Sequence, residues 1–412
     1  MKVRLSYFNP ISDHINSVIT LSGSKSESNR FLILKKFFPA IQLKNLSNSD
    51  DTLFLIDGLT SNQNEIDVSN AGTTIRFLTA YYSMMKGSSV KLTGSKRMQQ
   101  RPIGVLVNAL RDLGADISYL NEEGYPPIQI EGVNLDGEKI TMDAEVSSQF
   151  ISAMMLIAPV LSNGLTIELK GEIASRSYIE LTNGVLNKIG VDSRFEDNLI
   201  SIKPFSLAEK LTLQIESDWS SASYWYGIVA MSERLSITLK YFESSSLQGD
   251  SIIVPIYEKL GVSTTFNSSE SSITISKNNN DIPDIIQLDL IETPDLAQTI
   301  AVTCFGLGVE CVLMGLKTLR IKETDRLTAL KKELEKLGAN VVVNSNSIRV
   351  IPTGELNEDV EVHTYDDHRM ALSFATLAVR ISIVIDQSDV VSKSYPSFWE
   401  DLKKAGFSLN FE

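Results

Sequence analysis

The chain has 412 residues, of which 43% are hydrophobic and 22% are charged, as is usual for globular proteins. Its net charge of −13 argues against nucleic acid as a partner, because a phosphate backbone needs a basic surface. The longest apolar runs are too short to span a bilayer, and two cysteines in this length fit a reducing compartment. We therefore expect a cytoplasmic protein of two or three domains, with Cys304 and Cys311 buried in the core.

Six segments combine a polar start with a helical apolar period. In chain order they cover residues 23–38, 69–85, 146–160, 217–231, 322–338 and 365–379. Each predicts a helix with Ser, Thr, Asp or Asn near its first turn, residues that cap helix N-termini well. A helix N-terminus also exposes free N–H groups and partial positive charge, so each start is a potential phosphate or carboxylate site. Plain capping is the alternative explanation for any one start taken alone.

A second pattern recurs between these segments, in which an amphipathic helix ends at glycine and an alternating strand follows. The pattern occurs around Gly114, Gly190, Gly261, Gly338 and Gly406, with a weaker copy around Gly58. Glycine commonly closes a helix in the left-handed conformation. The junction is common in α/β proteins, so one copy carries little weight, whereas recurrence predicts a repeated α/β unit. Six copies would divide into two halves of three.

Basic residues accompany the predicted helix starts. They are Lys25, Arg30, Arg76, Lys322, Arg326 and Arg369, with Lys96, Arg97, Arg101 and Lys393 elsewhere. If they converge, they form a cationic pocket for more than one anionic group, and arginine suits bidentate binding of carboxylate and phosphate. Lys322 and Arg326 are four residues apart, so we expect a helix to place both on one face, with Glu323 beside them. A solvated charged helix face is the alternative.

Six short motifs occur in a fixed order along the chain. They are GSKSxSNR at 23–30, NAGTxxR at 70–76, RPIG at 101–104, SSQF at 147–150, KETDR at 322–326 and DHRMA at 367–371. In this combination the sequence resembles the EPSP synthases, an enolpyruvyl transferase family. The resemblance implies an inside-out α/β fold of two domains, each with three βαβαββ units. It also implies a shikimate 3-phosphate half at 23–217, a phosphoenolpyruvate and catalytic half at 1–22 plus 218–412, and an active site in the cleft between them.

The resemblance implies a transferase that moves the enolpyruvyl group of phosphoenolpyruvate to the 5-hydroxyl of shikimate 3-phosphate and releases phosphate. This step belongs to chorismate and aromatic amino acid biosynthesis. The chemistry needs cations for the substrate anions, a base for the hydroxyl proton and an acid for the methylene carbon. Lysine and arginine can supply the positive charge, so we expect no metal and no cofactor. The two substrates are the expected partners of a monomer, without nucleic acid or membrane.

The nearest alternative is the sister transferase that acts on UDP-N-acetylglucosamine and shares the fold. That enzyme would carry a reactive cysteine in a mobile loop. Here Cys304 and Cys311 both lie in an apolar segment, which favours the shikimate enzyme. A non-catalytic phosphosugar-binding protein on the same repeats is a second alternative, and the joint presence of Asp295, Glu323 and His368 argues against it.

Residue roles follow from the matching motifs. Lys25, Asp295, Glu323 and His368 are the catalytic candidates, with Asp295 as the base and Glu323 as the proton donor. The candidates for shikimate 3-phosphate binding are Lys25, Ser26, Arg30, Ser147, Ser148, Gln149, Ser175, Tyr178, Asp295 and Lys322. The candidates for phosphoenolpyruvate binding are Lys25, Asn70, Gly72, Arg101, Gln149, Arg326, Arg369 and Lys393.

Several candidates have an ordinary structural explanation as well. Asp295 follows a proline and fits a turn or a helix cap. His368 fits a hydrogen-bonded structural histidine, Tyr178 fits simple packing, and Lys393 fits a surface lysine.

Three positions depart from the family pattern. Phe77 stands where many members have proline, next to the expected phosphoenolpyruvate site. Trp219 interrupts a run of small residues, and Thr318 stands where some members have asparagine near the substrate. None of these departures removes a charged catalytic candidate.

Overall fold

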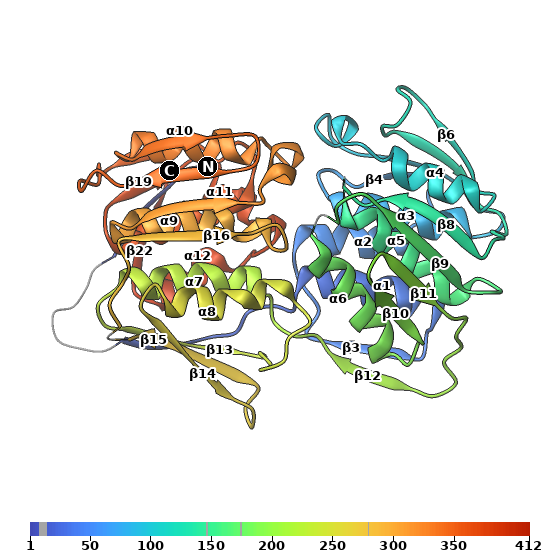
Figure 1. The fold of residues 1–412 in the computed structure, drawn as a ribbon, viewed down its shortest axis with the longest axis horizontal. Coiled ribbons are helices and arrows are strands. Elements are labelled where there is room, and N and C mark those ends of the chain that lie inside the picture. Colours follow the sequence, from blue (N-terminus) through green and yellow to red (C-terminus); the bar gives the residue numbers. More distant parts are fainter. Residues whose placement is uncertain (8–14, 146, 174, 279) are drawn as a thin grey trace. The chain divides into compact units, whose positions relative to one another are not determined.

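The computed structural model describes residues 1–7, 15–145, 147–173, 175–278 and 280–412. The chain divides into two compact units: unit 1 comprises Met1–Gly23 and Glu216–Glu412, and unit 2 comprises Ser24–Ile215. In each unit the helices lie in the middle and the sheets lie at the periphery (Figure 1). No helix within the described ranges is long and apolar enough to cross a membrane.

Unit 2 contains three sheets, whose strand orders are β4-β5-β7-β6, β10-β11-β9-β8 and β12-β3. Its helices are α1 (Lys25–Phe37), α2 (Asp50–Thr60), α3 (Gly72–Ser83), α4 (Gly104–Asp112), α5 (Ser148–Ile157) and α6 (Arg176–Lys188). Its strands are β3 (Ile41–Lys44), β4 (Glu65–Asp67), β5 (Ser89–Thr93), β6 (Asp116–Tyr119), β7 (Ile128–Glu131), β8 (Lys139–Asp143), β9 (Leu165–Lys170), β10 (Ser193–Glu196), β11 (Leu199–Ile202) and β12 (Leu211–Gln214).

Unit 1 also contains three sheets, whose strand orders are β14-β15-β13-β2, β16-β17-β19-β18 and β20-β21-β1-β22. Its helices are α7 (Trp219–Met231), α8 (Ile253–Glu258), α9 (Ala297–Leu307), α10 (Arg326–Lys336), α11 (His368–Ala375) and α12 (Phe398–Lys404). Its strands are β1 (Val3–Tyr7), β2 (Ile15–Ile19), β13 (Leu235–Lys240), β14 (Val262–Asn267), β15 (Ser272–Lys277), β16 (Ile285–Asp289), β17 (Glu310–Met314), β18 (Asn340–Val343), β19 (Ile348–Ile351), β20 (Val360–Val362), β21 (Ile383–Ile385) and β22 (Phe407–Phe411).

Five of the six sheets of the described residues share one pattern of strand directions, a parallel pair followed by two antiparallel pairings. In one of them β16 pairs in parallel with β17, β17 pairs antiparallel with β19, and β19 pairs antiparallel with β18. Strands such as β13 bury alternate residues, so each sheet has one face on the core and one outside. Helix α7 buries twelve of its 13 residues, as a helix surrounded by other elements must. The predicted α/β fold with three sheets per half is confirmed.

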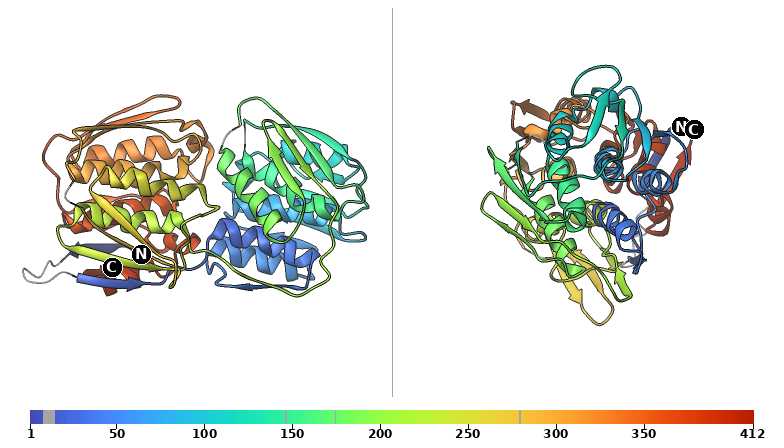
Figure 2. Two further views of the ribbon diagram at one scale, coloured as in Figure 1. Left: turned by 60° about the horizontal axis from the view of Figure 1, so that its bottom comes forward. Right: turned by 90° about the vertical axis from the view of Figure 1, so that its right-hand side faces the viewer.

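The sheet that holds β1 closes with strands from both ends of the sequence. β1 pairs antiparallel with β21 on one side and with β22 on the other. The backbone N–H of Lys2 donates to the Glu412 carbonyl at 3.0 Å, and the reverse bond has the same length. Figure 2 shows the two chain ends side by side in this sheet. The N-terminal strand thus belongs to unit 1 although unit 2 follows it in sequence.

The five strong helix–glycine–strand copies are confirmed. Their glycines have φ between 86° and 109°, and a strand begins within three residues of each. The prediction of a sixth copy was wrong, because Gly58 lies inside α2 and does not end the helix. A Cβ at Gly58 would lie 2.5 Å from Leu78 Cδ1, so this glycine serves close helix packing. The corresponding sheet has only the strands β3 and β12.

The six predicted helix starts are confirmed as those of α1, α3, α5, α7, α10 and α11. Five of these helices have a side-chain cap, from Ser24, Ser147, Asp218, Asp325 and Asp367, whereas α3 follows Ala71. One local prediction was wrong. Because Asp325 caps α10, the helix begins only at Arg326, and Lys322 follows the 3₁₀ helix η5 (Lys317–Ile321). Lys322 and Arg326 therefore do not share a helix face.

Candidate active site

Arg326 is the centre of a buried charged cluster in unit 1. Its side chain is 2% exposed. Nε donates to Asp367 Oδ2 at 2.6 Å and Nη2 donates to Asp367 Oδ1 at 3.2 Å. Nη1 donates to Asp295 Oδ1 and Nη2 donates to Glu323 Oε2, each at 2.8 Å. One guanidinium group therefore joins three carboxylates that come from three separate segments of the chain.

Asp295 receives positive charge from three side chains. It lies in the 3₁₀ helix η4 (Pro294–Leu296), immediately before α9. Besides Arg326, Lys322 Nζ lies 3.5 Å from Oδ1 and Arg369 Nη2 lies 3.4 Å from Oδ2. Burial by itself raises the pKa of Asp295, but the cations of Lys322, Arg369 and Arg326 outweigh burial and hold the pKa well below its usual range. The carboxylate is therefore ionised, and Asp295 is more than a turn residue.

Glu323 forms the second carboxylate of the cluster. It lies in the short link between η5 and α10, and its side chain is 12% exposed. Lys393, at the end of the 3₁₀ helix η7 (Ser388–Lys393), donates from Nζ to Glu323 Oε1 at 2.9 Å. Lys393 is itself only 12% exposed, so it is not a surface lysine. Glu323 thus lies between two cations, as Asp295 does.

The start of α11 supplies three consecutive residues of this cluster. Asp367 is fully buried and caps the helix, because its Oδ1 accepts from the Arg369 backbone N–H at 2.9 Å. His368 is 2% exposed, and its Nδ1 lies 3.6 Å from Asp367 Oδ1. Arg369 donates from Nη1 to the Asp295 carbonyl at 3.1 Å. The helix start therefore places the Arg369 guanidinium directly against Asp295.

Two further polar groups extend the cluster behind Arg369. Nη2 of Arg369 donates to Ser220 Oγ at 3.2 Å, and the Ser220 hydroxyl donates to Asp250 Oδ2. Burial raises the pKa of Asp250 to about 6, although the nearby Arg369 lowers it. The sequence reasoning missed Ser220, Asp250 and Asp367. Asp367 lies inside the DHRMA motif, whereas Asp250 has no local signal and is found only through its contacts.

In unit 2, Arg30 has a buried guanidinium whose hydrogen bonds go to neutral oxygens. Nε donates to Thr182 Oγ1 at 2.7 Å, and Nη2 donates to Ser152 Oγ and to the Tyr178 carbonyl, each at 3.1 Å. Nη1 donates to the Ser26 carbonyl at 2.7 Å. Burial lowers the pKa of Arg30 to about 10, which leaves the side chain charged at neutral pH.

Lys25 and Asp51 form an ion pair at two neighbouring helix starts. Lys25 is the first residue of α1 and Asp51 is the second residue of α2. Lys25 Nζ lies 3.3 Å from Asp51 Oδ2, and the lysine side chain is 18% exposed. The sequence reasoning did not identify Asp51 as the partner of this lysine.

Arg101 lies directly over Gly72. A Cβ built at Gly72 would lie 2.7 and 2.8 Å from the two terminal nitrogens of Arg101. Gly72 is the first residue of α3, so its backbone N–H is one of the free groups of that helix start. Only glycine therefore allows Arg101 this close approach.

The remaining unit 2 candidates lie at other helix starts. Asn70 accepts from the Ser95 hydroxyl just before α3. Gln149 donates from Nε2 to Thr73 Oγ1 at 3.1 Å, and Ser147 caps the same helix, α5, one residue before Ser148. Ser175 precedes α6 with a left-handed φ of 55°, and the Tyr178 carbonyl accepts from Arg30.

Two of the departures from the family pattern, Phe77 and Trp219, place an aromatic ring against a charged group. Phe77 is buried in α3, and the Arg30 guanidinium carbon lies 5.6 Å from its ring centroid, within the range of a cation–π contact. Trp219 is buried at the start of α7, where its indole N–H donates to Glu216 Oε1 at 2.8 Å. Each aromatic ring thus contacts a charged group.

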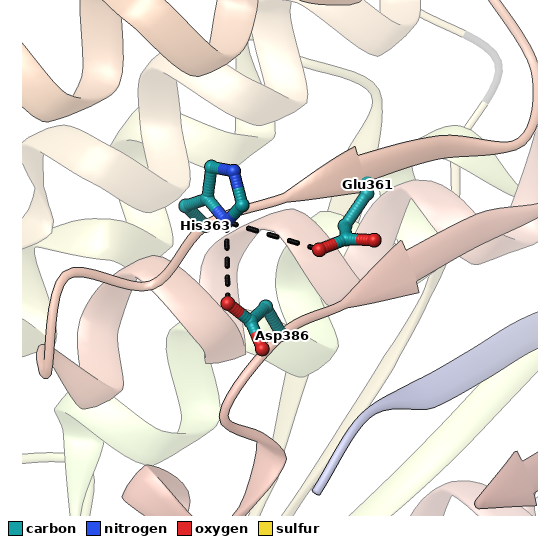
Figure 3. Close-up of side chains that lie close together, drawn as sticks. All are labelled: Glu361, His363 and Asp386. Carbon is teal, nitrogen blue, oxygen red and sulfur yellow. Dashed lines mark hydrogen bonds and ion pairs between the residues drawn. The ribbon is translucent and has the colours of Figure 1, made fainter. Parts of the chain in front are cut away.

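Among the described residues, one group of three side chains has the composition of a metal site. Glu361, His363 and Asp386 offer ligand atoms that lie within 4.8 Å of one another (Figure 3). His363 Nδ1 lies 3.2 Å from Asp386 Oδ2 and 3.9 Å from Glu361 Oε1. The Lys2 ammonium lies 2.7 Å from Glu361 Oε2, so this carboxylate already has a counter-ion within the protein.

The candidate residues thus form one group in each unit. Unit 1 holds Asp295, Lys322, Glu323, Arg326, His368, Arg369 and Lys393, and unit 2 holds Lys25, Ser26, Arg30, Asn70, Gly72, Arg101, Ser147, Ser148, Gln149, Ser175 and Tyr178. Buried carboxylates among lysines and arginines are typical of enzymes that bind anionic substrates and transfer protons, and this is the class that the two groups indicate.

Comparison with known proteins narrows this class to one family. The structure resembles that of an EPSP synthase from Acinetobacter baumannii, with a TM-score of 0.77 and 20% identity over the whole of both chains. The sequence model of the family "EPSP synthase (3-phosphoshikimate 1-carboxyvinyltransferase)" matches residues 42–402. A 3-phosphoshikimate 1-carboxyvinyltransferase of Bacteroides fragilis (strain YCH46) is 44% identical over 98% of this chain and 99% of its own.

A more distant relative carries the same name. The 3-phosphoshikimate 1-carboxyvinyltransferase of Sulfurovum sp. (strain NBC37-1) is 33% identical over 95% of this chain and 96% of its own. The chain belongs to the EPSP synthase family, a family of transferases.

Proposed function

We propose that this protein transfers the enolpyruvyl group of phosphoenolpyruvate to the 5-hydroxyl of shikimate 3-phosphate. The products are 5-enolpyruvylshikimate 3-phosphate and phosphate. The observation that carries the proposal is the Asp295 carboxylate, which is buried and ionised beside Lys322, Arg326 and Arg369. A base held among cations suits a reaction between two anionic substrates, because the same cations bind the anions and keep the base deprotonated.

Asp295 takes the proton from the 5-hydroxyl as its oxygen bonds to C2 of phosphoenolpyruvate. Without substrate its pKa is far too low for a strong base, since three cations surround it. Bound phosphate and carboxylate groups would partly neutralise those cations and so raise the proton affinity of Asp295 when it is needed. Glu323 protonates C3, and the resulting tetrahedral intermediate loses phosphate to give the enol ether. His368 lies beside this cluster as a neighbouring partner.

The remaining roles are assigned by substrate. Lys25, Ser26, Arg30, Ser147, Ser148, Gln149, Ser175, Tyr178 and Lys322 bind shikimate 3-phosphate. Lys25, Asn70, Gly72, Arg101, Gln149, Arg326, Arg369 and Lys393 bind phosphoenolpyruvate. Arg326 donates to three carboxylates and Arg101 lies over the Gly72 backbone, so both are held in place before a substrate arrives.

The cysteines support the shikimate substrate over UDP-N-acetylglucosamine. Cys304 and Cys311 are both free thiols, and both are completely buried in α9 and β17. A covalent or acidic role for a cysteine would need access to the substrate. We also propose that the enzyme works as a cytoplasmic monomer, which light scattering coupled to size-exclusion chromatography would test.

The test of the function is phosphate release from phosphoenolpyruvate by the purified protein, with shikimate 3-phosphate or UDP-N-acetylglucosamine as the acceptor. Release with shikimate 3-phosphate alone is the expected result. Release with UDP-N-acetylglucosamine alone would contradict the proposed acceptor substrate. Release with neither acceptor would contradict the proposed transferase function.

A further inference from the structure

The loop that precedes α11 has a backbone that needs support. Tyr365 and Asp366 are consecutive residues with φ of 55° and 56°. Neither is glycine, and two adjacent left-handed residues cost energy that the surroundings must offset. The loop leads directly into Asp367, His368 and Arg369. Whatever holds this backbone therefore also sets where three residues of the charged cluster lie.

Glu333 holds the first part of this loop, at His363 and Tyr365. It lies on α10 and is fully buried. Its Oε2 accepts from the His363 backbone N–H at 3.1 Å, and its Oε1 accepts from the Tyr365 hydroxyl at 2.6 Å. Lys336 donates to Oε2 at 2.6 Å, which gives the buried carboxylate a counter-ion. Burial and the neighbouring Glu333 raise the pKa of Tyr365, so its hydroxyl remains a donor at every working pH.

The same helix holds the other end of the loop. Arg326 lies seven residues before Glu333, which is close to two helical turns, so both side chains lie on one face of α10. Arg326 donates twice to Asp367. Helix α10 therefore fixes the loop at His363 and Tyr365 through Glu333, and at Asp367 through Arg326.

Contacts after β21 hold the loop from a different element. Gln387 Oε1 accepts from Thr364 Oγ1 at 2.9 Å and from the Asp366 backbone N–H at 3.4 Å. The His363 ring lies beside Asp386, as Figure 3 shows. These contacts involve Thr364, His363 and the Asp366 backbone, whereas Glu333 accepts from the Tyr365 hydroxyl, and the Tyr365 ring also lies 6.4 Å from the His363 ring between centroids. The Asp367 backbone N–H donates to the Thr364 carbonyl at 3.0 Å across the left-handed pair. The Glu333–Tyr365 and Gln387–Asp366 bonds hold this turn against its surroundings.

We propose that Glu333 and Tyr365 are positioning residues for the reaction, which act through Arg369 and Asp367 without touching a substrate. This inference rests on the proposed function, because it takes Arg369 as a ligand of phosphoenolpyruvate. Without the Glu333–Tyr365 bond, the left-handed pair relaxes toward ordinary backbone angles and the start of α11 shifts. Arg369 then loses its geometry against Asp295, and phosphoenolpyruvate binds more weakly.

The experiment compares Tyr365→Phe, Glu333→Gln and the double variant in the full chain. Both substitutions keep the size of the side chain. We expect the KM for phosphoenolpyruvate to rise about tenfold in either single variant, and the KM for shikimate 3-phosphate to change by less than about twofold. The double variant should be no worse than the more affected single variant, because Glu333→Gln weakens the same bond that Tyr365→Phe removes.

Tyr226→Phe is the matched control. Tyr226 is also buried in unit 1, and its hydroxyl shares a 2.8 Å hydrogen bond with Thr264 Oγ1. This variant should lose a similar amount of stability with both KM values unchanged. A KM for phosphoenolpyruvate that stays constant in Tyr365→Phe, or that rises equally in Tyr226→Phe, would overturn the proposal.

Hydrogen exchange separates failure of this proposal from failure of the proposed function. Tyr365→Phe should speed amide exchange across residues 363–369 more than Tyr226→Phe does, with or without turnover. If the wild-type protein showed no transferase activity, the proposed function would fall while this readout still tested the loop. Unchanged exchange at residues 363–369 would contradict the role of the bond.

Discussion

Arg326 and Asp295 are joined by a 2.8 Å hydrogen bond between Nη1 and Oδ1, and the same guanidinium also donates to Glu323 and Asp367. The candidate base and the candidate proton donor therefore share one arginine. The nearby Glu323 carboxylate raises the pKa of Asp295, against the stronger opposite effect of the cations, so a change of charge at Glu323 alters the proton affinity of the candidate base.

Asp295→Asn removes the candidate base and keeps its shape. We expect turnover to fall on the order of 10²–10⁴-fold, the usual loss when general base catalysis is removed. Binding of shikimate 3-phosphate, measured by calorimetry, should persist, since most of its proposed ligands lie in unit 2. Asp289→Asn, at an exposed position in the same unit, is the control and should keep full activity. Loss of binding together with turnover would contradict the assignment of Asp295 as the base.

Gly72→Ala places a methyl group where the Arg101 guanidinium lies. Because the gap is only 2.7 to 2.8 Å, Arg101 must move, and we expect the KM for phosphoenolpyruvate to rise roughly tenfold, equivalent to about 1.4 kcal/mol of binding. Gly114→Ala is the control, since Gly114 has φ of 92° and open space around it. That control should lower stability through backbone strain and leave the KM unchanged. Equal KM values in Gly72→Ala and the wild type would refute the proposed role of Arg101.

Asp250→Asn tests the buried carboxylate behind Arg369. The folded-state pKa of Asp250 is about 6, above the unfolded value of 3.8, so the folded protein holds this proton more tightly. The stabilisation is complete below pH 3.8 and is lost as pH rises through 6, a change of roughly 3 kcal/mol. The variant should therefore be more stable than the wild type at pH 7.5, and its stability should change less between pH 4 and pH 6.

Urea unfolding followed by tryptophan fluorescence measures this effect. All three tryptophans, Trp219, Trp225 and Trp399, lie in unit 1, so the signal reports on the unit that contains Asp250. Glu270→Gln removes an exposed carboxylate from the same unit whose pKa is lowered by its hydrogen bond to Lys240, so any change that it causes in the pH dependence should have the opposite sign. A wild-type pH dependence in Asp250→Asn would show that this carboxyl does not titrate as described.

Trp219→Phe leaves the buried Glu216 carboxylate without its indole donor. Loss of a hydrogen bond to a buried charged group should cost about 1.5–3 kcal/mol of unfolding free energy, measured through the two remaining tryptophans. Trp399→Phe removes a comparable indole bond at 2.9 Å, but its acceptor is the neutral carbonyl of Ser388. The loss at Trp219 should exceed the loss at Trp399. Glu216 Oε2 also accepts from Ser246 Oγ at 2.5 Å and from Gln248 Nε2 at 3.2 Å. The reverse order would mean that these two donors are sufficient for Glu216.

Local patterns predicted the repeated architecture because each copy of the helix–glycine–strand pattern is contained in a few consecutive residues. Gly190 and Gly338 follow amphipathic helices and precede alternating strands, and both have the left-handed φ that the pattern requires. Gly58 has a similar local pattern, but it lies inside α2, where Leu78 leaves no room for a side chain. That contact comes from a different helix, so no local window contains it.

The candidate site was likewise predictable from local motifs only in part. Basic residues and capping residues were visible as motifs, and the structure confirms that Asp367 and Ser147 cap their helices. The carboxylate partners were not visible, since Asp51 and Asp250 meet Lys25 and Ser220 only after distant segments fold together. The prediction that Lys322 lies on a helix was wrong because Asp325 caps α10, so the helix begins after Lys322.

The pairing of β1 with β22 has a consequence for synthesis in the cell. Unit 2 is one continuous segment, Ser24–Ile215, and it can fold as soon as that segment has left the ribosome. Val3–Tyr7 are made before unit 2, whereas their partners on both sides, Ile383–Ile385 and Phe407–Phe411, are made after it. The nascent chain must therefore carry this strand unpaired while the whole of unit 2 is synthesised. An unpaired strand whose Val3 and Leu5 are destined for the core is an aggregation hazard until its partners have been made.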